Sequence, residues 1–390
     1  MIYEQSIHWT KTNYVKDRFW YELKWMSGKR EEDNHEIKLK TGRNLFDKIE
    51  LTINNKRMNE LKSYFDLIKK DVKKAGLDFD AIIYLHNEIV LINKEKRDNR
   101  SFGFIRLIIK KEGTTICTED IPICTETLLS LEDVVKCSIM NCCKKYHHIG
   151  IRGEKRRFKK MPHVLSAKAA GFFIHEIIGH LLEADYYSYF KDRYKGMKIA
   201  PHLTVIDSAK DVENVAGIGE YDDVGNKMKS ITLIQNGVIN NVMSVDKHNS
   251  FDNEVYGFAR RSSFKDPIMP RMRNTYIQPC QDMYKQDILN QYKEAVLIEE
   301  TNLGVVDYYS GEFKLYGNGF IVREGILQNF LGELCVYGNI KRDISMIEYI
   351  GKDFKLYGGY CGKMGQSVHV GFGGPTISLL EMTSEGVIYG

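Results

Sequence analysis

Residues 166–185 read SAKAAGFFIHEIIGHLLEAD and contain the most apolar run of the chain. Ser166 is a favourable N-cap residue, and the apolar residues after it predict about five turns of buried helix. A buried helix tolerates His175, Glu176 and His180 only if they are paired or bound, because an unpaired polar group taken from water costs on the order of 1–3 kcal/mol. A metal ion is the simplest common partner, since neutral imidazole is a frequent zinc ligand.

The spacing of the two histidines predicts a distorted helix. They follow the pattern HExxxH, and residues five apart in a regular α-helix point roughly 140° away from each other. A π-bulge between them would turn both imidazoles toward one ion, and Gly179 beside His180 would ease that deformation. We therefore predict irregular helical bonding between His175 and His180. The alternative is that each imidazole is satisfied separately in the core.

The same segment supplies a base, and its two histidines leave one protein ligand of the metal still to be identified. Glu176 is placed to take a proton from a water held by the metal, as in HExxH metallopeptidases. Glu183 and Asp185 are local candidates for the third ligand of a tetrahedral site. The distant candidate is Cys361, because seven of the eighteen residues at 357–374 are glycine, which implies close backbone contacts, and thiolate is a good zinc ligand. On the residues alone, Glu183 and Cys361 are equally good.

The composition is that of a globular protein and excludes several classes. The 390 residues are 43% hydrophobic and 28% charged, and the formal net charge is +4. This near balance gives no reason to expect a nucleic-acid partner. The N-terminus shows no apolar signal-peptide core, no run is long enough to span a bilayer, and the eight cysteines are scattered as reduced thiols would be. We therefore expect a cytoplasmic protein without a membrane segment.

The pattern along the chain predicts an α+β protein with two lobes. Residues 1–155 alternate helical and strand patterns and are expected to form an N-terminal α/β lobe. Residues 160–390 are expected to form a β-rich C-terminal lobe that carries the zinc-binding helix. The basic stretch 150–160 is expected to be a solvated linker between them. The elements expected in the first lobe are helices at 58–75 and 128–146 and strands at 81–85 and 88–92.

Turn residues divide the C-terminal lobe into hairpins. Asn236-Gly237 suits a two-residue type I′ turn, in which both central residues need a positive φ. Ser310-Gly311 and Glu324-Gly325 mark similar turns. One further helix is expected at residues 281–296, and the remainder is expected to be mainly antiparallel sheet.

Four blocks of the chain resemble, in sequence and in order, those of the TldD/PmbA family of cytoplasmic metallopeptidases, on its zinc-bearing TldD side. The resemblance covers about residues 160–380. The blocks lie at residues 165–185, at 260–263 with 269–276, at 306–313, and at 361–376, where CGKMGQS begins the last block.

The resemblance implies a complete set of site residues. Zinc would be held by His175, His180 and Cys361, with Glu176 as the general base. Glu183 and Asp185 would then not bind zinc directly; they would contact the ligand residues and orient His180 or the ion. The family resemblance also implies action on unfolded or small peptides, in an assembly with a homologous zinc-free subunit or by self-association.

Two arginines of the second block, Arg271 and Arg273, have two alternative roles. They could bind the carboxylate or backbone of a peptide, or they could brace the glycine-rich segment through bidentate pairs. The sequence leaves both roles open. The whole sequence predicts a zinc metallopeptidase that acts on peptides. The alternative is a non-catalytic peptide-binding subunit of a hetero-oligomeric assembly with a structural zinc, against which the intact Glu176 argues.

Overall fold

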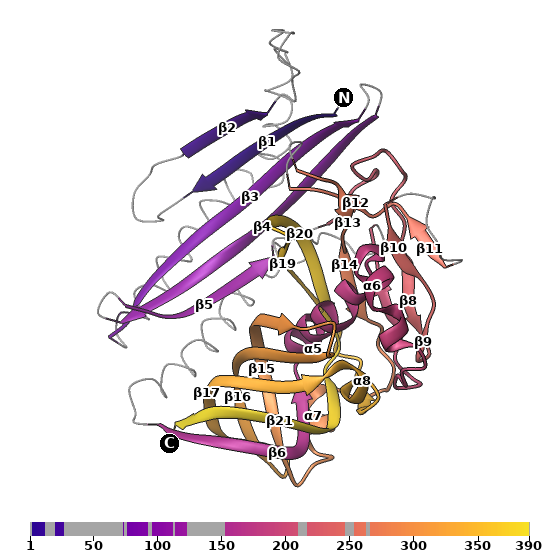
Figure 1. Cartoon of the computed structure of the whole chain (residues 1–390). Coiled ribbons are helices and arrows are strands. Elements are labelled where there is room, and N and C mark those ends of the chain that lie inside the picture. Colours follow the sequence, from indigo (N-terminus) through magenta and orange to yellow (C-terminus); the bar gives the residue numbers. More distant parts are fainter. Residues whose placement is uncertain are drawn as a thin grey trace.

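The structure is a computed structural model (Figure 1). It describes residues 2–11, 20–26, 73, 76–92, 96–111, 114–122, 153–209, 217–245, 253–262 and 266–389. This described part of the chain is mostly β-sheet with few helices, as predicted for the C-terminal lobe. None of its helices has the length and apolar character that a bilayer-spanning segment needs.

The N-terminal part contains an antiparallel sheet of five strands in the order β2-β1-β3-β4-β5. Two strands predicted at 81–85 and 88–92 are one continuous strand, because β3 pairs with β4 without interruption. The helix predicted at 128–146, and all of the one at 58–75 except Lys73, lie outside the described residues. The strands are β1 (Ile2–Lys11), β2 (Trp20–Met26), β3 (Asp78–Ile92), β4 (Lys96–Lys111) and β5 (Thr114–Pro122).

One of the two six-stranded sheets of the C-terminal part closes into a barrel. Its order is β17-β16-β15-β6-β21-β18, and β17 also pairs with β21, so five strands form a closed ring. Such closure leaves no free edge between these neighbours. The barrel strands are β6 (Glu154–Leu165), β15 (Glu294–Val306), β16 (Glu312–Arg323), β17 (Ile326–Asn339) and β21 (Ile377–Tyr389), with β18 (Ile347–Ile350) beside β21.

A second sheet has the order β19-β20-β14-β7-β8-β9. Strand β5 of the N-terminal sheet lies beside β19. The strands are β7 (Val205–Asp207), β8 (Ile231–Gln235), β9 (Val238–Ile239), β14 (Asn274–Ile277), β19 (Lys355–Lys363) and β20 (Gln366–Gly374). Two small pairs complete the β-structure: β10 (Val242–Ser244) with β11 (Glu254–Tyr256), and β12 (Ala259–Arg260) with β13 (Met269–Pro270).

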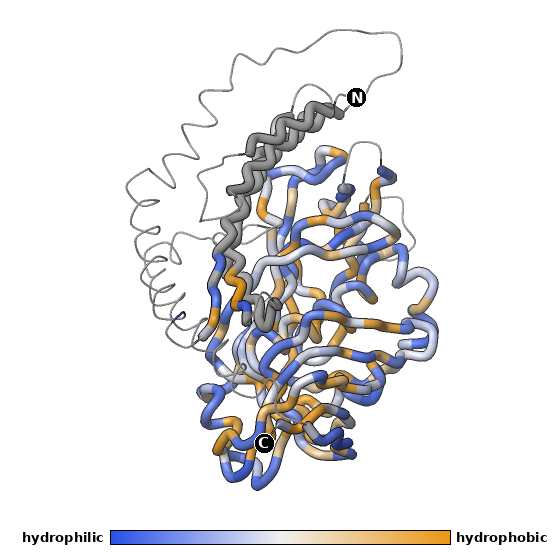
Figure 2. The backbone as a smooth tube through the Cα atoms, turned by 90° about the vertical axis from the view of Figure 1, so that its left-hand side faces the viewer, coloured by the Kyte–Doolittle hydropathy of each residue, from blue (hydrophilic) through white to orange (hydrophobic). Residues whose placement is uncertain are grey.

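Helix α5 (Ala167–Ile174) lies between the two larger sheets, in contact with β15 on one side and with β14 and β20 on the other (Figure 1). Its approach to β20 is very close, because a Cβ on Gly171 would collide with the backbone of Gly373. Buried side chains of α5 and of both sheets form one hydrophobic cluster. Figure 2 shows hydrophobic and hydrophilic residues alternating along many of the strands, as half-buried strands require.

The predicted turns agree with the structure. Asn236 and Gly237 have φ of 48° and 77°, and Glu324 and Gly325 have 49° and 75°, so each pair makes a two-residue turn between adjacent strands. Gly311, with φ of 81°, lies in the connection between β15 and β16.

Two predictions of the sequence are corrected. The helix expected at 281–296 is only α7 (Lys285–Leu289), and β15 begins at Glu294. Ala295 and Leu297 enter one hydrophobic cluster while Val296 and Ile298 enter another, so this apolar run is a strand buried on both faces. The stretch expected to be a linker is also different, because residues 154–160 form the first half of β6 and pair with β21.

Candidate metal centre

The helical segment at 166–185 is irregular where the sequence predicted it. Ser166 caps α5 by accepting a hydrogen bond from the Ala169 amide at 3.3 Å. Residues His175–Gly179 then form a π-helical turn in which the His180 amide bonds the His175 carbonyl, five residues back. The predicted distortion is confirmed. Gly179 has a further role, since a Cβ there would collide with the sulfur of Met272.

The predicted single helix ends at Glu183, which is a correction. After a short 3-10 turn (His180–Leu182), Glu183 takes an extended conformation with φ of −79° and ψ of 130°. It is the N-cap of a new helix, α6 (Ala184–Tyr194). The break turns the Glu183 side chain back toward the histidines, where it contacts His180.

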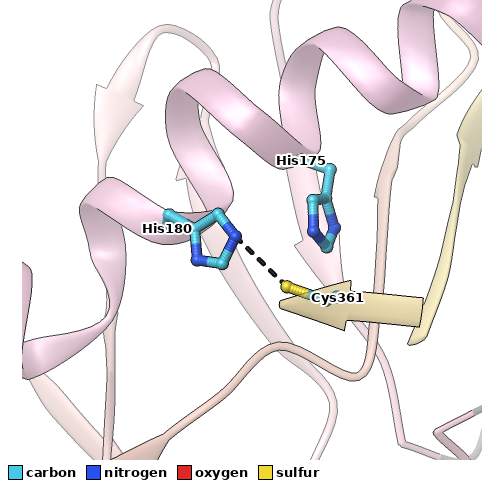
Figure 3. Close-up of side chains that lie close together, drawn as sticks. All are labelled: His175, His180 and Cys361. Atoms are coloured by element: carbon cyan, nitrogen blue, oxygen red, sulfur yellow. Dashed lines mark hydrogen bonds between the residues drawn. The ribbon is translucent and has the colours of Figure 1, made fainter. Parts of the chain in front are cut away.

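Cys361 reaches the same place from a hairpin far along the chain. Strands β19 and β20 are joined by Met364 and Gly365, whose φ values of 48° and 78° make a tight turn. The Cys361 Sγ lies 3.2 Å from His180 Nε2, and both imidazoles point toward it in Figure 3. One ligand atom from each of His175, His180 and Cys361 lies within 4.8 Å of the others, and all three residues are buried.

The charges of these residues are strongly coupled. Burial lowers the pKa of His180, but the charges of Glu183 and Cys361 raise it well above its usual value. Burial raises the pKa of the Cys361 thiol, yet the two imidazoles more than reverse this and hold that pKa well below its usual range. This lowered pKa favours the thiolate, which is the form of cysteine that binds metals.

Glu183 supports His180 from the side opposite to Cys361. Its Oε2 lies 2.9 Å from His180 Nδ1, while Oε1 accepts the Met272 amide at 3.1 Å. Burial raises the pKa of Glu183, but the charge of His180 and its hydrogen bond lower it to about 2. Because Nδ1 faces Glu183 and Nε2 faces Cys361, a metal ion held by Nε2 would be held with Cys361 and not with Glu183. The geometry thus favours Cys361 between the two candidates that the sequence left open.

Lys363 connects this carboxylate to the strand of Cys361. Its side chain is only 1% exposed, and its ammonium lies 2.7 Å from Glu183 Oε2 and 2.7 Å from Asp185 Oδ1. Burial lowers the pKa of Lys363, but the charges of Glu183 and Asp185 raise it above the usual value. Asp185 therefore contacts Lys363 directly and reaches His180 only through Glu183.

Arg271 and Arg273 are both completely buried. Arg271 donates to the Cys361 carbonyl at 2.5 Å, and its Nε and Nη1 have no hydrogen-bond partner among the described residues. Arg273 donates to the Gly217 carbonyl at 3.4 Å, and its amide bonds the Asp207 carboxylate. The contact of Arg271 with Cys361 supports the bracing role, whereas binding of a peptide by either arginine remains a prediction.

Glu176 lies in the π-turn between the two imidazoles in sequence, and it is half-buried. No hydrogen bond or ion pair to its carboxylate is formed by the described residues. The side chain lies against Gly304 of β15, and the Tyr308 hydroxyl donates to the Glu176 carbonyl at 2.5 Å. Burial, followed by the charge of Glu176, raises the pKa of Tyr308 well above its usual value, so this hydroxyl keeps its proton.

The residues fit a zinc ion. His175 Nδ1 is buried without a hydrogen-bond partner among the described residues, which is costly unless the ring binds something. Two imidazoles and a thiolate form a donor set typical of zinc, and a catalytic site keeps its fourth position open. His180 also has the carboxylate partner on its other ring nitrogen that metal-binding histidines usually have.

Residues 159–386 match a family described as the PmbA/TldA metallopeptidase C-terminal domain. The chain belongs to the PmbA/TldD family of metallopeptidases. The match begins in β6 and ends in β21, so it includes the barrel, the second sheet and all three candidate ligands.

Proteins named as metalloproteases are similar to this part of the chain. A metalloprotease of Methanocaldococcus jannaschii is 33% identical over 231 residues, which are 58% of this chain and 51% of that protein. A zinc metalloprotease TldD homolog of Saccharolobus solfataricus is 28% identical over 244 residues, which are 61% of this chain and 54% of that protein. The chain thus matches about half the length of these relatives.

A solved structure shares the fold across nearly the whole chain. TldE from Thermococcus kodakarensis superposes with a TM-score of 0.62 at 11% identity, covering 98% of this chain and 95% of that one. At this identity the likeness is one of fold alone.

Sequence reasoning missed three residues near the metal centre: Lys363, Gly304 and Tyr308. Lys363 could have been found, because it lies two residues after Cys361 and alternate residues of a strand share a face. Tyr308 belongs to the block at 306–313, but no spacing rule joins it to Glu176. The place of Gly304 depends on how α5 packs on β15, which a single sequence does not reveal.

Proposed function

We propose that the protein is a zinc-dependent peptidase that hydrolyses unfolded or small peptides. The observation that carries the proposal is the convergence of His175, His180 and Cys361, all buried, beside a half-buried Glu176 whose carboxylate forms no hydrogen bond or ion pair with the described residues. A purely structural zinc site has no use for such a carboxylate. Similarity to proteins named as metalloproteases supports the same reaction class.

The chain's own residues would divide the reaction among them. A bound zinc ion would supply Lewis-acid chemistry, lowering the pKa of water and polarising the scissile carbonyl. Glu176 removes a proton from the attacking water and returns it to the leaving amine. Glu183 holds His180 in the tautomer that presents Nε2 to the metal, because it faces Nδ1 at 2.9 Å. Lys363 balances the charge of Glu183, so that carboxylate stays fixed as the Glu176 carboxyl gains and loses a proton.

Substrate binding is proposed to use the peptide backbone. An extended peptide that pairs with a strand edge is held by main-chain hydrogen bonds with little side-chain selectivity. This mode would suit the clean-up of unfolded peptides or the processing of a leader or precursor. We also propose a cytoplasmic location and assembly with a homologous zinc-free subunit or with a second copy, as the family resemblance implies.

Replacing Glu176 by glutamine tests the proposed function. Glu176→Gln keeps the shape of the side chain but cannot accept the water's proton, so cleavage of an unfolded peptide should fall by roughly 10² to 10⁴. Zinc content and fold should be unchanged. Wild type and variant would be assayed on an unfolded peptide and on a compact folded domain, with and without any homologous partner subunit.

The alternative function, a non-catalytic peptide-binding subunit with a structural zinc, predicts a different result. In that case the wild type binds zinc and peptide but cleaves no unfolded peptide in either setting. If wild type cleaves and Glu176→Gln cleaves equally well, Glu176 is not the base and the mechanism is wrong.

A further inference from the structure

The hairpin of β15 and β16 contacts Glu176 at two points. Gly304 of β15 lies against the side chain, and Tyr308, just after the strand, binds the backbone carbonyl. Both contacts involve the residue proposed as the base, and neither involves a candidate zinc ligand. The hairpin therefore fixes Glu176 independently of the metal-binding side chains.

Gly304 supplies the space that the Glu176 side chain occupies. A Cβ added to Gly304 would lie 2.8 Å from Glu176 Cγ and 3.0 Å from its Cδ, both closer than van der Waals contact. These atoms belong to a flexible side chain, whereas Gly304 is held in the barrel by pairing with Leu315. A larger residue would consequently displace the carboxylate and leave the strand in place. Glycine inside a strand commonly marks such a close approach.

Tyr308 is itself held rigidly. Its ring packs against those of Tyr186 at 5.2 Å and Phe190 at 6.1 Å, and its carbonyl accepts the Tyr194 hydroxyl at 2.9 Å. These three partners all belong to α6. These contacts hold the Tyr308 ring in place. Its hydroxyl therefore donates from a fixed position to the backbone carbonyl of Glu176 in the π-turn.

We propose that Tyr308 is a positioning residue that orients Glu176 at the metal centre, and that Gly304 sets where its carboxylate lies. The inference rests on the proposed function, since it assigns Tyr308 a role through the base. A wide π-turn is rarer and less regular than an α-helical turn, so an external donor to its backbone limits the positions that the base can adopt.

A double-mutant cycle separates positioning from general support of the fold. Wild type, Tyr308→Phe, Glu176→Gln and the double variant would be compared on a quenched fluorescent peptide without stable structure. Loss of the single hydroxyl should lower kcat roughly three- to tenfold with little change in KM. In the Glu176→Gln background the same change should have no further effect, because the group being positioned is gone.

Tyr309→Phe is the matched control. Tyr309 is adjacent, 63% exposed, and its ring lies beside Arg193 instead of Glu176. Zinc content should be the same in all variants. Hydrogen exchange of the amides at 176–181 provides a measure that needs no activity: Tyr308→Phe should speed it roughly two- to tenfold, and Tyr309→Phe should not.

Gly304→Ala tests the second half of the proposal. The variant should keep its zinc and lose about tenfold or more in kcat, because a displacement of the base of the order of 1 Å can cost about a hundredfold. An unchanged kcat would overturn the role of Gly304.

The outcomes distinguish this inference from the proposed function. If Glu176→Gln is inactive but Tyr308→Phe has wild-type kcat and exchange, the positioning role is wrong while the function stands. Equal losses in both backgrounds would mean that Tyr308 supports the fold only, which also overturns it. If wild type cleaves no peptide, the proposed function fails, and unchanged exchange in Tyr308→Phe would then remove the positioning contact as well.

Discussion

Glu183 links the helix of His180 to the strand of Cys361, and replacing it by glutamine measures how much that link stabilises the fold. The pKa of Glu183 is lowered from 4.5 to about 2 although the residue is fully buried. Because one pKa unit corresponds to about 1.4 kcal/mol, the ionised carboxylate contributes about 3 kcal/mol. Glu183→Gln removes this contribution and leaves Asp185 as the one carboxylate in contact with the Lys363 ammonium among the described residues.

The pH dependence follows from the sign of the shift. The pKa is lower in the folded state than in the unfolded chain, so the stabilisation is complete above about pH 5. It is lost as the pH falls through 4.5 toward 2. The difference between wild type and Glu183→Gln should therefore be about 3 kcal/mol at pH 7 and clearly smaller at pH 3.

Urea unfolding of metal-free protein is the assay, because removal of zinc with a chelator takes metal binding out of the comparison. Glu312→Gln is the control, since Glu312 is exposed on β16 and its substitution should change the unfolding free energy by less than about 0.5 kcal/mol. A difference below about 1 kcal/mol for Glu183→Gln at pH 7 would refute the reasoning. A difference that is the same at pH 3 would do so too.

Three further results are expected. Wild type should hold about one zinc per chain, and Cys361→Ala should lose most of it, whereas Glu183→Ala should bind zinc more loosely. Elemental analysis measures the zinc content. Full zinc occupancy in Cys361→Ala would contradict the ligand assignment. Lys363→Met should lower the unfolding free energy by about 3 kcal/mol, because Glu183 keeps a buried charge with one partner fewer; an unchanged urea midpoint would exclude this role. Gly171→Ala should destabilise by about 1–3 kcal/mol, since the new methyl group meets the backbone of Gly373; a melting temperature equal to that of wild type would show that the contact can relax.

The sequence was sufficient to predict the helix distortion at His175 and His180, and its residues alone were insufficient to choose the third candidate ligand. The angle between residues five apart in a helix required a distortion at His175 and His180, and the structure has a π-turn there. That argument is local, so one sequence can support it. The residues alone left Glu183 and Cys361 equal, and only the family resemblance implied Cys361. The physical reason for favouring Cys361 is which imidazole nitrogen each residue faces, and this is a tertiary fact that the geometry supplies.

The wrong helix at 281–296 has a related cause. Consecutive apolar residues such as Ala295 to Ile298 fit either a buried helix or a strand that is covered on both faces. Strand β15 lies between two hydrophobic clusters, and the neighbouring sequence gives no sign that a second cluster covers its other face. The break at Glu183 was missed in the same way, because its cause is a set of contacts with Met272 and Lys363 that lie far along the chain.

The separation of the candidate ligands along the chain has a consequence for synthesis. Cys361 follows His180 by 181 residues, and translation at about 5–20 residues per second needs roughly 10–40 s to cover that distance. During this interval the nascent polypeptide would carry both imidazoles and the carboxylate of Glu176 but not the thiolate of Cys361. Under the proposed function, hydrolysis would therefore become possible only after Cys361 and the four barrel strands that precede it, β6, β15, β16 and β17, have been synthesised.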